Sequence, residues 1–176
     1  MNAKTYQVLF VCSGNSCRSP MAEGLLKTRI PAEWQDKVIV RSAGTLGILG
    51  NPATNFAIEV AQQLDADIFR HRSQGVTEEL LRPSDIIFAM APEHRTFLNG
   101  HYPEFRENVF LLRSFGRRPG EIESERIEDP IGGNLAVYQK CVEILDVELD
   151  RIYPLLAKLI EQKFGYVGME KNKGIS

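Results

Sequence analysis

The 176-residue chain has few cysteines, little excess charge and no long hydrophobic run, and each shortage excludes a class of protein. Three cysteines cannot form a disulfide framework and no pair has zinc-finger spacing, which favours a reducing compartment and a cytoplasmic location. The net charge of −2 gives no basis for binding nucleic acid or an anionic membrane surface. The apolar run near the N-terminus is too short for a signal peptide or a membrane span.

The composition is that of an ordinary globular chain. Hydrophobic residues make up 43% and charged residues 25% of the sequence, and 176 residues are enough for a substantial core. There is no internal repeat, low-complexity tract or interdomain linker. We therefore expect one domain over residues 1–164. Residues 165–176 contain Gly and Lys and predict a flexible C-terminal tail.

Residues 8–20 contain the most informative pattern in the chain. Residues 8–11 are an unbroken β-prone run, which is typical of a strand buried on both faces of a parallel sheet. Ser19 followed by Pro20 predicts the start of a helix that runs to about residue 29. The loop between this strand and this helix holds Cys12 and, six positions later, Arg18.

Such a loop is suited to phosphate chemistry. Amides of a loop that enters a helix N-terminus converge on an anion site, and the fork of Arg18 matches two phosphate oxygens. Gly14 permits a close backbone approach, and Asn15 tolerates the left-handed conformation. The same positive field predicts a lowered pKa for Cys12, whose thiolate would attack phosphorus and form a phosphocysteine.

Residues 12–20, Cys-Ser-Gly-Asn-Ser-Cys-Arg-Ser-Pro, resemble the signature loop of the low-molecular-weight protein tyrosine phosphatase family. The Gly-Lys-Ser/Thr ending of a nucleotide-binding Walker loop is absent. The resemblance spans about residues 6–160. It implies a metal-independent phosphatase without a cofactor, which acts on a phosphorylated protein or peptide as a monomer or weak dimer. It also implies an α/β fold: a flavodoxin-like, doubly wound sheet of four parallel strands in the order 2-1-3-4, with helices on both faces.

The resemblance implies a role for each position of the loop. Cys12 is the expected nucleophile, Arg18 holds the phosphoryl oxygens, and Ser19 donates to the Cys12 sulfur. Cys17 is either a partner that captures oxidised Cys12 as a reversible disulfide or a small buried loop residue. The expected phosphate-binding amides belong to Ser13, Gly14, Asn15, Ser16, Cys17 and Arg18.

Strands and helices are expected to alternate along the rest of the chain. Short apolar runs predict the remaining strands, at residues 37–42, 85–90 and 109–112. Capping signals and helical spacing predict intervening helices that start near residues 51, 77 and 92, and the last of them ends before Asn99-Gly100.

An apolar, Gly-rich loop follows the second strand. Leu46 and Ile48 either form a wall of the substrate cleft or fold onto the core, and the sequence leaves both open. His71 is favoured as a capping or packing residue rather than a catalytic one. Ala91 stands where many family members carry a polar residue, which puts in doubt any hydrogen bond from that position.

Residues 113–133 have no clear periodicity, and loops of that length in a compact domain are usually functional or disordered. Phosphoryl transfer from an amino-acid side chain needs a proton donor for the leaving group. Asp-Pro alone is more typical of a turn, but Asp129-Pro130 lies where the resemblance implies the general acid. Ile131 follows as a candidate residue of the substrate pocket.

A strong apolar stripe predicts a final helix from about Asn134, and Pro154 predicts a kink or a division in it. We expect the stripe to pack on the sheet rather than on a coiled-coil partner. Tyr138 and Cys141 are expected in the core. The stripe comprises Leu135, Tyr138, Val142, Leu145, Leu149, Ile152, Leu156 and Leu159.

The substrate is the most open part of the prediction. Phosphotyrosine comes first. Ser16 stands where tyrosine-specific members often have a bulky aliphatic residue, and it resembles the threonine of the protein-arginine phosphatase branch, so phosphoarginine is the alternative. A thioredoxin-coupled arsenate reductase uses a similar loop but needs extra cysteines that Cys141 alone does not supply. A non-catalytic phosphate-binding module would need neither the nucleophile nor Asp129.

Overall fold

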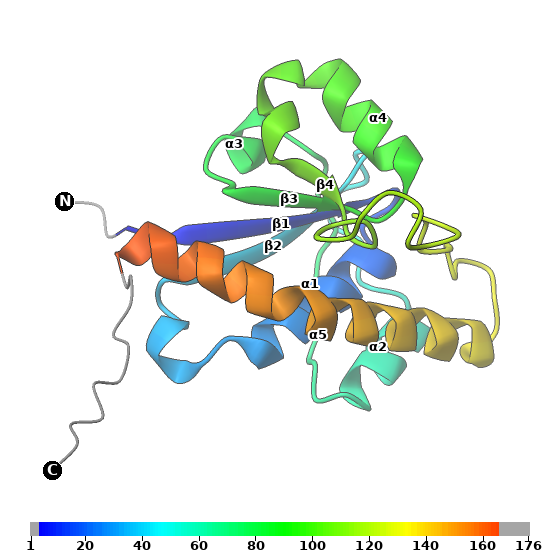
Figure 1. Cartoon of the computed structure of the whole chain (residues 1–176). Coiled ribbons are helices and arrows are strands. Elements are labelled where there is room, and N and C mark those ends of the chain that lie inside the picture. Colours follow the sequence, from blue (N-terminus) through cyan, green and yellow to red (C-terminus); the bar gives the residue numbers. More distant parts are fainter. Residues whose placement is uncertain (1–3, 166–176) are drawn as a thin grey trace, which may run out of the picture.

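A four-stranded parallel sheet, in the order β2-β1-β3-β4, forms the centre of the molecule (Figure 1). The computed structural model describes residues 4–165, so most of the expected C-terminal tail lies outside the described residues. The strands are β1 (Tyr6–Cys12), β2 (Val38–Gly44), β3 (Ile86–Ala89) and β4 (Val109–Leu111). This flavodoxin-like topology confirms the predicted fold class and strand order.

Helices cover both faces of the sheet (Figure 1). Val8 and Phe10 of β1 face the larger core, while Leu9 and Val11 face the smaller one, as the alternation of a strand requires. Against the larger core pack α1 (Arg18–Arg29), α2 (Asn55–Gln62) and α5 (Leu135–Phe164); against the smaller one pack α3 (Glu78–Leu81), α4 (Pro92–His101) and the 3₁₀ helix η2 (Pro103–Asn108). A further 3₁₀ helix, η1, covers Ala32–Trp34.

The topology places the loop after β1 at a switch point of the sheet. β2 lies on one side of β1 and β3 on the other, so the chain leaves β1 where the strand order reverses. In open α/β sheets, ligands bind at the carboxyl ends of the strands at this point. Residues 13–17 therefore lie where a ligand site is expected.

Two of the expected helix boundaries are wrong. Residues 51–54 are not helical, because their backbone is bonded elsewhere: the Thr54 amide donates to the Ser16 carbonyl at 3.0 Å, and the Ser73 amide donates to the Asn51 carbonyl at 2.7 Å. Helix α4 continues through Asn99-Gly100 to His101, and its hydrogen bonding extends to the Tyr102 amide, which donates to the Leu98 carbonyl at 2.8 Å.

Helix α5 runs for 30 residues through Pro154, so the predicted division is wrong. The side chains on either side of Pro154 explain this, because Ile152 and Leu156 are fully buried in the larger core. Packing of this kind outweighs the roughly 3 kcal/mol that an interior proline costs a helix. At the end of the stripe, Ile160 is buried instead of Leu159, which is part exposed. Among residues 4–165, no helix combines the length and the apolarity that a bilayer crossing requires.

Candidate active site

Asn15 holds the loop of residues 12–18 (the phosphate loop) in shape from inside. Its φ of 55° is left-handed, a conformation that asparagine tolerates better than most residues. Its side-chain amide donates to Ser19 Oγ and Ser42 Oγ, both at 2.9 Å, and its Oδ1 accepts from the Gln74 amide at 2.9 Å. His71 Nε2 lies 2.6 Å from the Asn15 carbonyl. His71 thus contacts the loop backbone. This agrees with the structural role, capping or packing, that the sequence favoured for it.

Gly44, at the end of β2, lets the phosphate loop lie directly against the sheet. A Cβ at this position would lie 2.5 Å from the Ser13 carbonyl oxygen, closer than real Cβ atoms come to backbone. The amides that follow bind the loop, since Thr45 donates to the Cys12 carbonyl at 2.9 Å and Leu46 donates to the Ser13 carbonyl at 3.0 Å. The loop is therefore fixed by the sheet before any ligand arrives.

Cys12 is buried at the floor of the loop, and its sulfur lies 2.9 Å from Ser19 Oγ. Burial raises the pKa of the Cys12 thiol, although the Ser19 hydroxyl and the Arg18 charge act in the opposite direction. The expected lowering of this pKa is therefore wrong. The physical reason is burial: at the floor of the loop the sulfur is kept from water, and the lost hydration disfavours the thiolate more than Ser19 and Arg18 stabilise it.

Arg18 is 2% exposed, and two of the three nitrogens of its guanidinium make hydrogen bonds to other residues. Nη1 donates to the Ile127 carbonyl at 3.0 Å, and Nη2 donates to Asp129 Oδ2 at 2.7 Å and to Ser13 Oγ at 3.3 Å. Nε is buried and has no hydrogen-bond partner among residues 4–165. A buried donor without an acceptor is uncommon, and a bound oxyanion would satisfy it.

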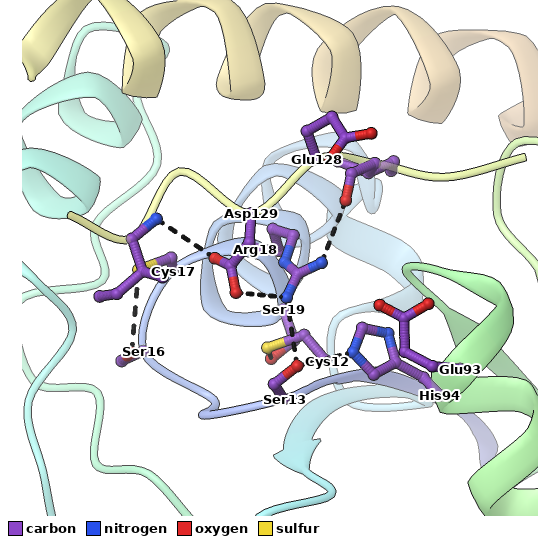
Figure 2. A network of polar contacts seen from close by, with 12 residues as sticks. Cys12, Ser13, Ser16, Cys17, Arg18, Ser19, Glu93, His94, Glu128 and Asp129 are labelled. Carbon is purple, nitrogen blue, oxygen red and sulfur yellow. Dashed lines mark hydrogen bonds and ion pairs between the residues drawn. The ribbon is translucent and has the colours of Figure 1, made fainter. Parts of the chain in front are cut away.

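Asp129 reaches this site from the long loop of residues 113–133 (the acid loop). Figure 2 shows its carboxylate facing Arg18, with Cys12 and Ser13 on the same side. The Asp129 side chain is 36% exposed. Its Oδ1 also accepts from the Ile131 amide at 3.3 Å. The Asp129 carboxylate thus contacts the guanidinium and remains open to solvent.

Glu148 of α5 ties the start of the acid loop to the body of the protein. This buried carboxylate accepts from Arg117 Nη1 at 2.8 Å and from Arg151 Nε at 2.7 Å, and Arg113 Nε lies 3.5 Å away. Burial pushes the pKa of Glu148 up, but Arg117 and Arg151 outweigh it and leave the pKa below its ordinary value. The sequence analysis missed this cluster; its signal is a carboxylate between the apolar residues Leu145 and Leu149.

A pocket of about 200 Å³ brings most of the predicted site residues together. Leu46 is 67% and Ile131 is 57% exposed, so these side chains lie at the rim and do not fold onto the core. Ser19 lies behind the floor, in contact with the sulfur. The pocket is lined by Cys12, Ser13, Gly14, Ser16, Cys17, Arg18, Leu46, Ile48, Asp129 and Ile131.

The three cysteines are free and buried. Cys17 Sγ lies 3.4 Å from the Tyr138 hydroxyl and 3.5 Å from Thr54 Oγ1. Cys141 is in the core, as predicted, and burial raises its pKa to about 12. No group of three or more His, Cys, Asp or Glu side chains within residues 4–165 is arranged to hold a metal ion.

His94, in the first turn of α4, is the second residue that the sequence analysis missed. It is 1% exposed, and its Nε2 lies 2.9 Å from Ser13 Oγ (Figure 2). Ala91 is the N-cap residue of the same helix, and its apolar side chain makes no capping hydrogen bond. The available signal was a histidine five residues after Ala89, the carboxyl end of the central strand β3.

Comparisons with known proteins agree with this geometry. The sequence profile of the family described as low molecular weight phosphotyrosine protein phosphatase matches residues 7–163. A protein-arginine-phosphatase of Bacillus subtilis (strain 168) is 32% identical over 155 residues, which cover 88% of this chain and 97% of that protein. The probable low molecular weight protein-tyrosine-phosphatase EpsP of Ralstonia solanacearum is 32% identical over 152 residues, with coverages of 86% and 97%.

Solved structures show the same likeness. A low molecular weight protein tyrosine phosphatase from T. tengcongensis superimposes with a TM-score of 0.76 at 36% identity, covering 85% of this chain and 99% of that one. A mutant of the arginine phosphatase YwlE, solved with a phosphorylated active-site serine, gives a TM-score of 0.76 at 32% identity, with coverages of 86% and 96%.

Proposed function

Because the chain belongs to the low molecular weight phosphotyrosine protein phosphatase family, we propose that it hydrolyses phosphotyrosine in proteins, with Cys12 as the nucleophile. The proposal rests mainly on one observation: the Cys12 sulfur, the Arg18 guanidinium and the Asp129 carboxylate line the same small pocket. The family is one of cysteine-dependent phosphatases, and phosphorylated proteins are its substrates.

In the first step, the arriving phosphoryl group releases Asp129 from Arg18, and the proton of the Cys12 thiol passes to the Asp129 carboxylate. The resulting Cys12 thiolate attacks phosphorus in line, and the bond from phosphorus to the substrate oxygen breaks. Protonated Asp129 gives its proton to that oxygen, which leaves as the tyrosine hydroxyl. The phosphoryl oxygens replace the Asp129 carboxylate as acceptors for Arg18 Nη2. They also accept from Arg18 Nε, which has no partner among the described residues. Amides of residues 13–18 supply further donors to the transition state.

In the second step, water attacks the phosphocysteine and the sulfur–phosphorus bond breaks. Asp129, now a carboxylate, takes the proton from that water. The Ser19 hydroxyl, 2.9 Å from the sulfur, stabilises the thiolate as it leaves. Phosphate and the original enzyme result, so the protons and charges balance without a further reactant.

The rim supports an aromatic substrate. Leu46, Ile48 and Ile131 present apolar surface beside the phosphate loop, which suits a phenyl ring between the phosphate and the peptide. Phosphoarginine is the second candidate, because the hydroxyl of Ser16 lines the same pocket and one similar protein is a protein-arginine-phosphatase. Arsenate reduction by a cysteine relay has less support, since the Cys141 sulfur is buried in α5 and faces the Glu128 carbonyl.

Turnover of p-nitrophenyl phosphate in EDTA tests the activity. We expect hydrolysis that is lost in Cys12→Ser, while Cys141→Ser, which removes a cysteine outside the pocket, stays active. Activity that survives Cys12→Ser would refute the proposal. Phosphotyrosine and phosphoarginine peptides then separate the two substrates, and Ser16→Ile is expected to favour the aromatic one. Preference for phosphoarginine in the unmodified enzyme would select the second candidate.

The remaining roles concern redox state. We propose that Cys17 captures an oxidised Cys12 as a disulfide, and that the enzyme works in the cytoplasm, where its nucleophile stays reduced. Peroxide treatment followed by mass spectrometry of the intact protein is the test. A loss of two hydrogens that dithiothreitol reverses is expected, and Cys17→Ser should instead accumulate irreversibly oxidised Cys12.

A further inference from the structure

His94 contacts the phosphate loop, but the mechanism above gives it no part. Its Nε2 lies 2.9 Å from Ser13 Oγ, and its ring is 1% exposed. Nδ1 is buried and has no hydrogen-bond partner within the described part of the chain, residues 4–165. A buried polar atom without a partner is uncommon, and here it reveals which ring nitrogen carries the proton.

The ring is neutral at physiological pH, since burial, followed by the charge of Arg18, lowers the pKa of His94 to about 4. A neutral imidazole has one proton, on Nδ1 or on Nε2. On Nδ1 that proton would be a buried donor without an acceptor, whereas on Nε2 it is donated to Ser13 Oγ. An unpaired buried acceptor is tolerated better than an unpaired buried N–H, so the proton belongs on Nε2.

This tautomer fixes the hydroxyl of Ser13. A hydroxyl has two acceptor lone pairs and one hydrogen. Both lone pairs of Ser13 Oγ are used, one by His94 Nε2–H and one by Arg18 Nη2 at 3.3 Å. The remaining hydrogen belongs to a side chain that lines the same pocket as Cys12, and Figure 2 shows the two side chains near each other.

We propose that the Ser13 hydroxyl donates a hydrogen bond to an oxygen of the phosphoryl group during transfer, and that His94 is the positioning residue that keeps this hydroxyl aimed. The inference rests on the phosphatase function proposed above and adds a side-chain donor to the loop amides. No bond is made or broken at Ser13. Its hydrogen stays on Oγ throughout, and His94 exchanges no proton.

Removal of the donor is the first test. Ser13→Ala is expected to lower kcat/KM for p-nitrophenyl phosphate about 10-fold to 100-fold, the effect of one hydrogen bond to a charged group. The inhibition constant of inorganic phosphate should rise with it. Ser13→Thr keeps a hydroxyl and should retain most of the activity. A Ser13→Ala enzyme within twofold of the original would overturn the inference.

A double-mutant cycle tests the positioning role. His94→Phe should lower kcat/KM when Ser13 is present but have little further effect in Ser13→Ala, because the hydroxyl that it positions is gone. His94→Gln restores a donor near the Nε2 position and should recover activity. His101→Phe, on the exposed end of the same helix, is the matched control. Equal losses from His94→Phe in both backgrounds would mean a merely structural residue.

The tautomer can be read on the unmodified protein, which needs no variant to fold. ¹⁵N NMR of the imidazole should show Nε2 protonated and Nδ1 unprotonated in His94; the opposite assignment would overturn the inference. The two proposals fail separately. Turnover that survives Cys12→Ser removes the phosphatase mechanism, whereas an inactive Cys12→Ser with an unaffected Ser13→Ala removes only the role of Ser13.

Discussion

The two loops that meet at the pocket are held in different ways. The phosphate loop is fixed from inside by the buried side chain of Asn15 and by amides at the end of β2. The acid loop is long and largely exposed, and it is tied down by ion pairs, with Glu148 at its start and Arg18 at its end. Binding of a phosphoryl group needs a preformed cradle, whereas the proton donor has to leave Arg18 when that group arrives.

The largest expected effect comes from the tip of the acid loop. Asp129→Asn keeps the shape of the side chain but removes the proton that it gives to the leaving oxygen. We expect kcat for p-nitrophenyl phosphate to fall about 10²-fold to 10⁴-fold, with a much smaller change in KM. Steady-state kinetics at several pH values is the measurement. Because kcat/KM reports only the steps up to the phosphocysteine, an equal loss of kcat/KM with a leaving group that needs no protonation would contradict the general-acid role.

Asn15→Ala breaks the phosphate loop from inside. It removes three hydrogen bonds, leaves the Gln74 amide unpaired and puts alanine at a φ of 55°. We expect a loss of about 3 kcal/mol in the free energy of unfolding, together with a fall in kcat/KM. Urea unfolding and steady-state kinetics measure the two losses.

Asp65 offers a matched control for this change. It has a φ of 60° but is exposed, so Asp65→Ala carries only the conformational cost of a left-handed alanine, about 1 kcal/mol. The difference between the two variants isolates the buried hydrogen bonds of Asn15. If both variants lost the same stability, those bonds would contribute nothing and the loop would not be fixed from inside.

Glu148→Gln tests the tether of the acid loop without touching the pocket. The change leaves Arg113, Arg117 and Arg151 without the buried carboxylate, so we expect a loss of about 3 kcal/mol in the free energy of unfolding. Catalysis should fall less than in Asn15→Ala, because Asp129 keeps its own contact with Arg18. Arg82→Ala, which breaks the exposed pair with Glu78, is the control and should cost under about 0.5 kcal/mol.

The same contrast explains what the sequence could predict. The phosphate loop depends on local signals: an apolar run, a Gly-Asn turn and a Pro at a helix start. The strand order and the role of Asp129 are predicted from the resemblance to a family. The start of α2 and the continuity of α5 depend on tertiary bonds and packing, which a local pattern does not contain. The direction of the Cys12 pKa is missed for a similar reason, since the burial that raises it comes from tertiary packing and not from the sequence of the loop.

The first turn of α4 contacts both loops, and a change there has the smallest expected effect on stability. His94 contacts Ser13 of the phosphate loop, while its neighbour Glu93 pairs with Arg126 of the acid loop. The pKa of His94 is lowered to about 4, by burial and then by Arg18, with Glu93 and Asp129 acting to raise it and Arg126 to lower it. Between pH 6.5 and 4 the unfolded chain therefore binds a proton at this residue that the folded chain does not bind.

The contribution of His94 to the free energy of unfolding is thus fully present above pH 6.5 and is lost as the pH falls toward 4. The expected loss from His94 alone is about 2 kcal/mol between pH 7.5 and pH 5. His94→Gln keeps a donor and does not titrate, so its unfolding free energy should fall less over the same interval, while the carboxylates of Glu93 and Asp129 act alike in both proteins. Urea unfolding of the two proteins at pH 7.5 and pH 5 measures the difference. Parallel losses would mean that His94 is protonated as readily in the folded chain as in the unfolded one.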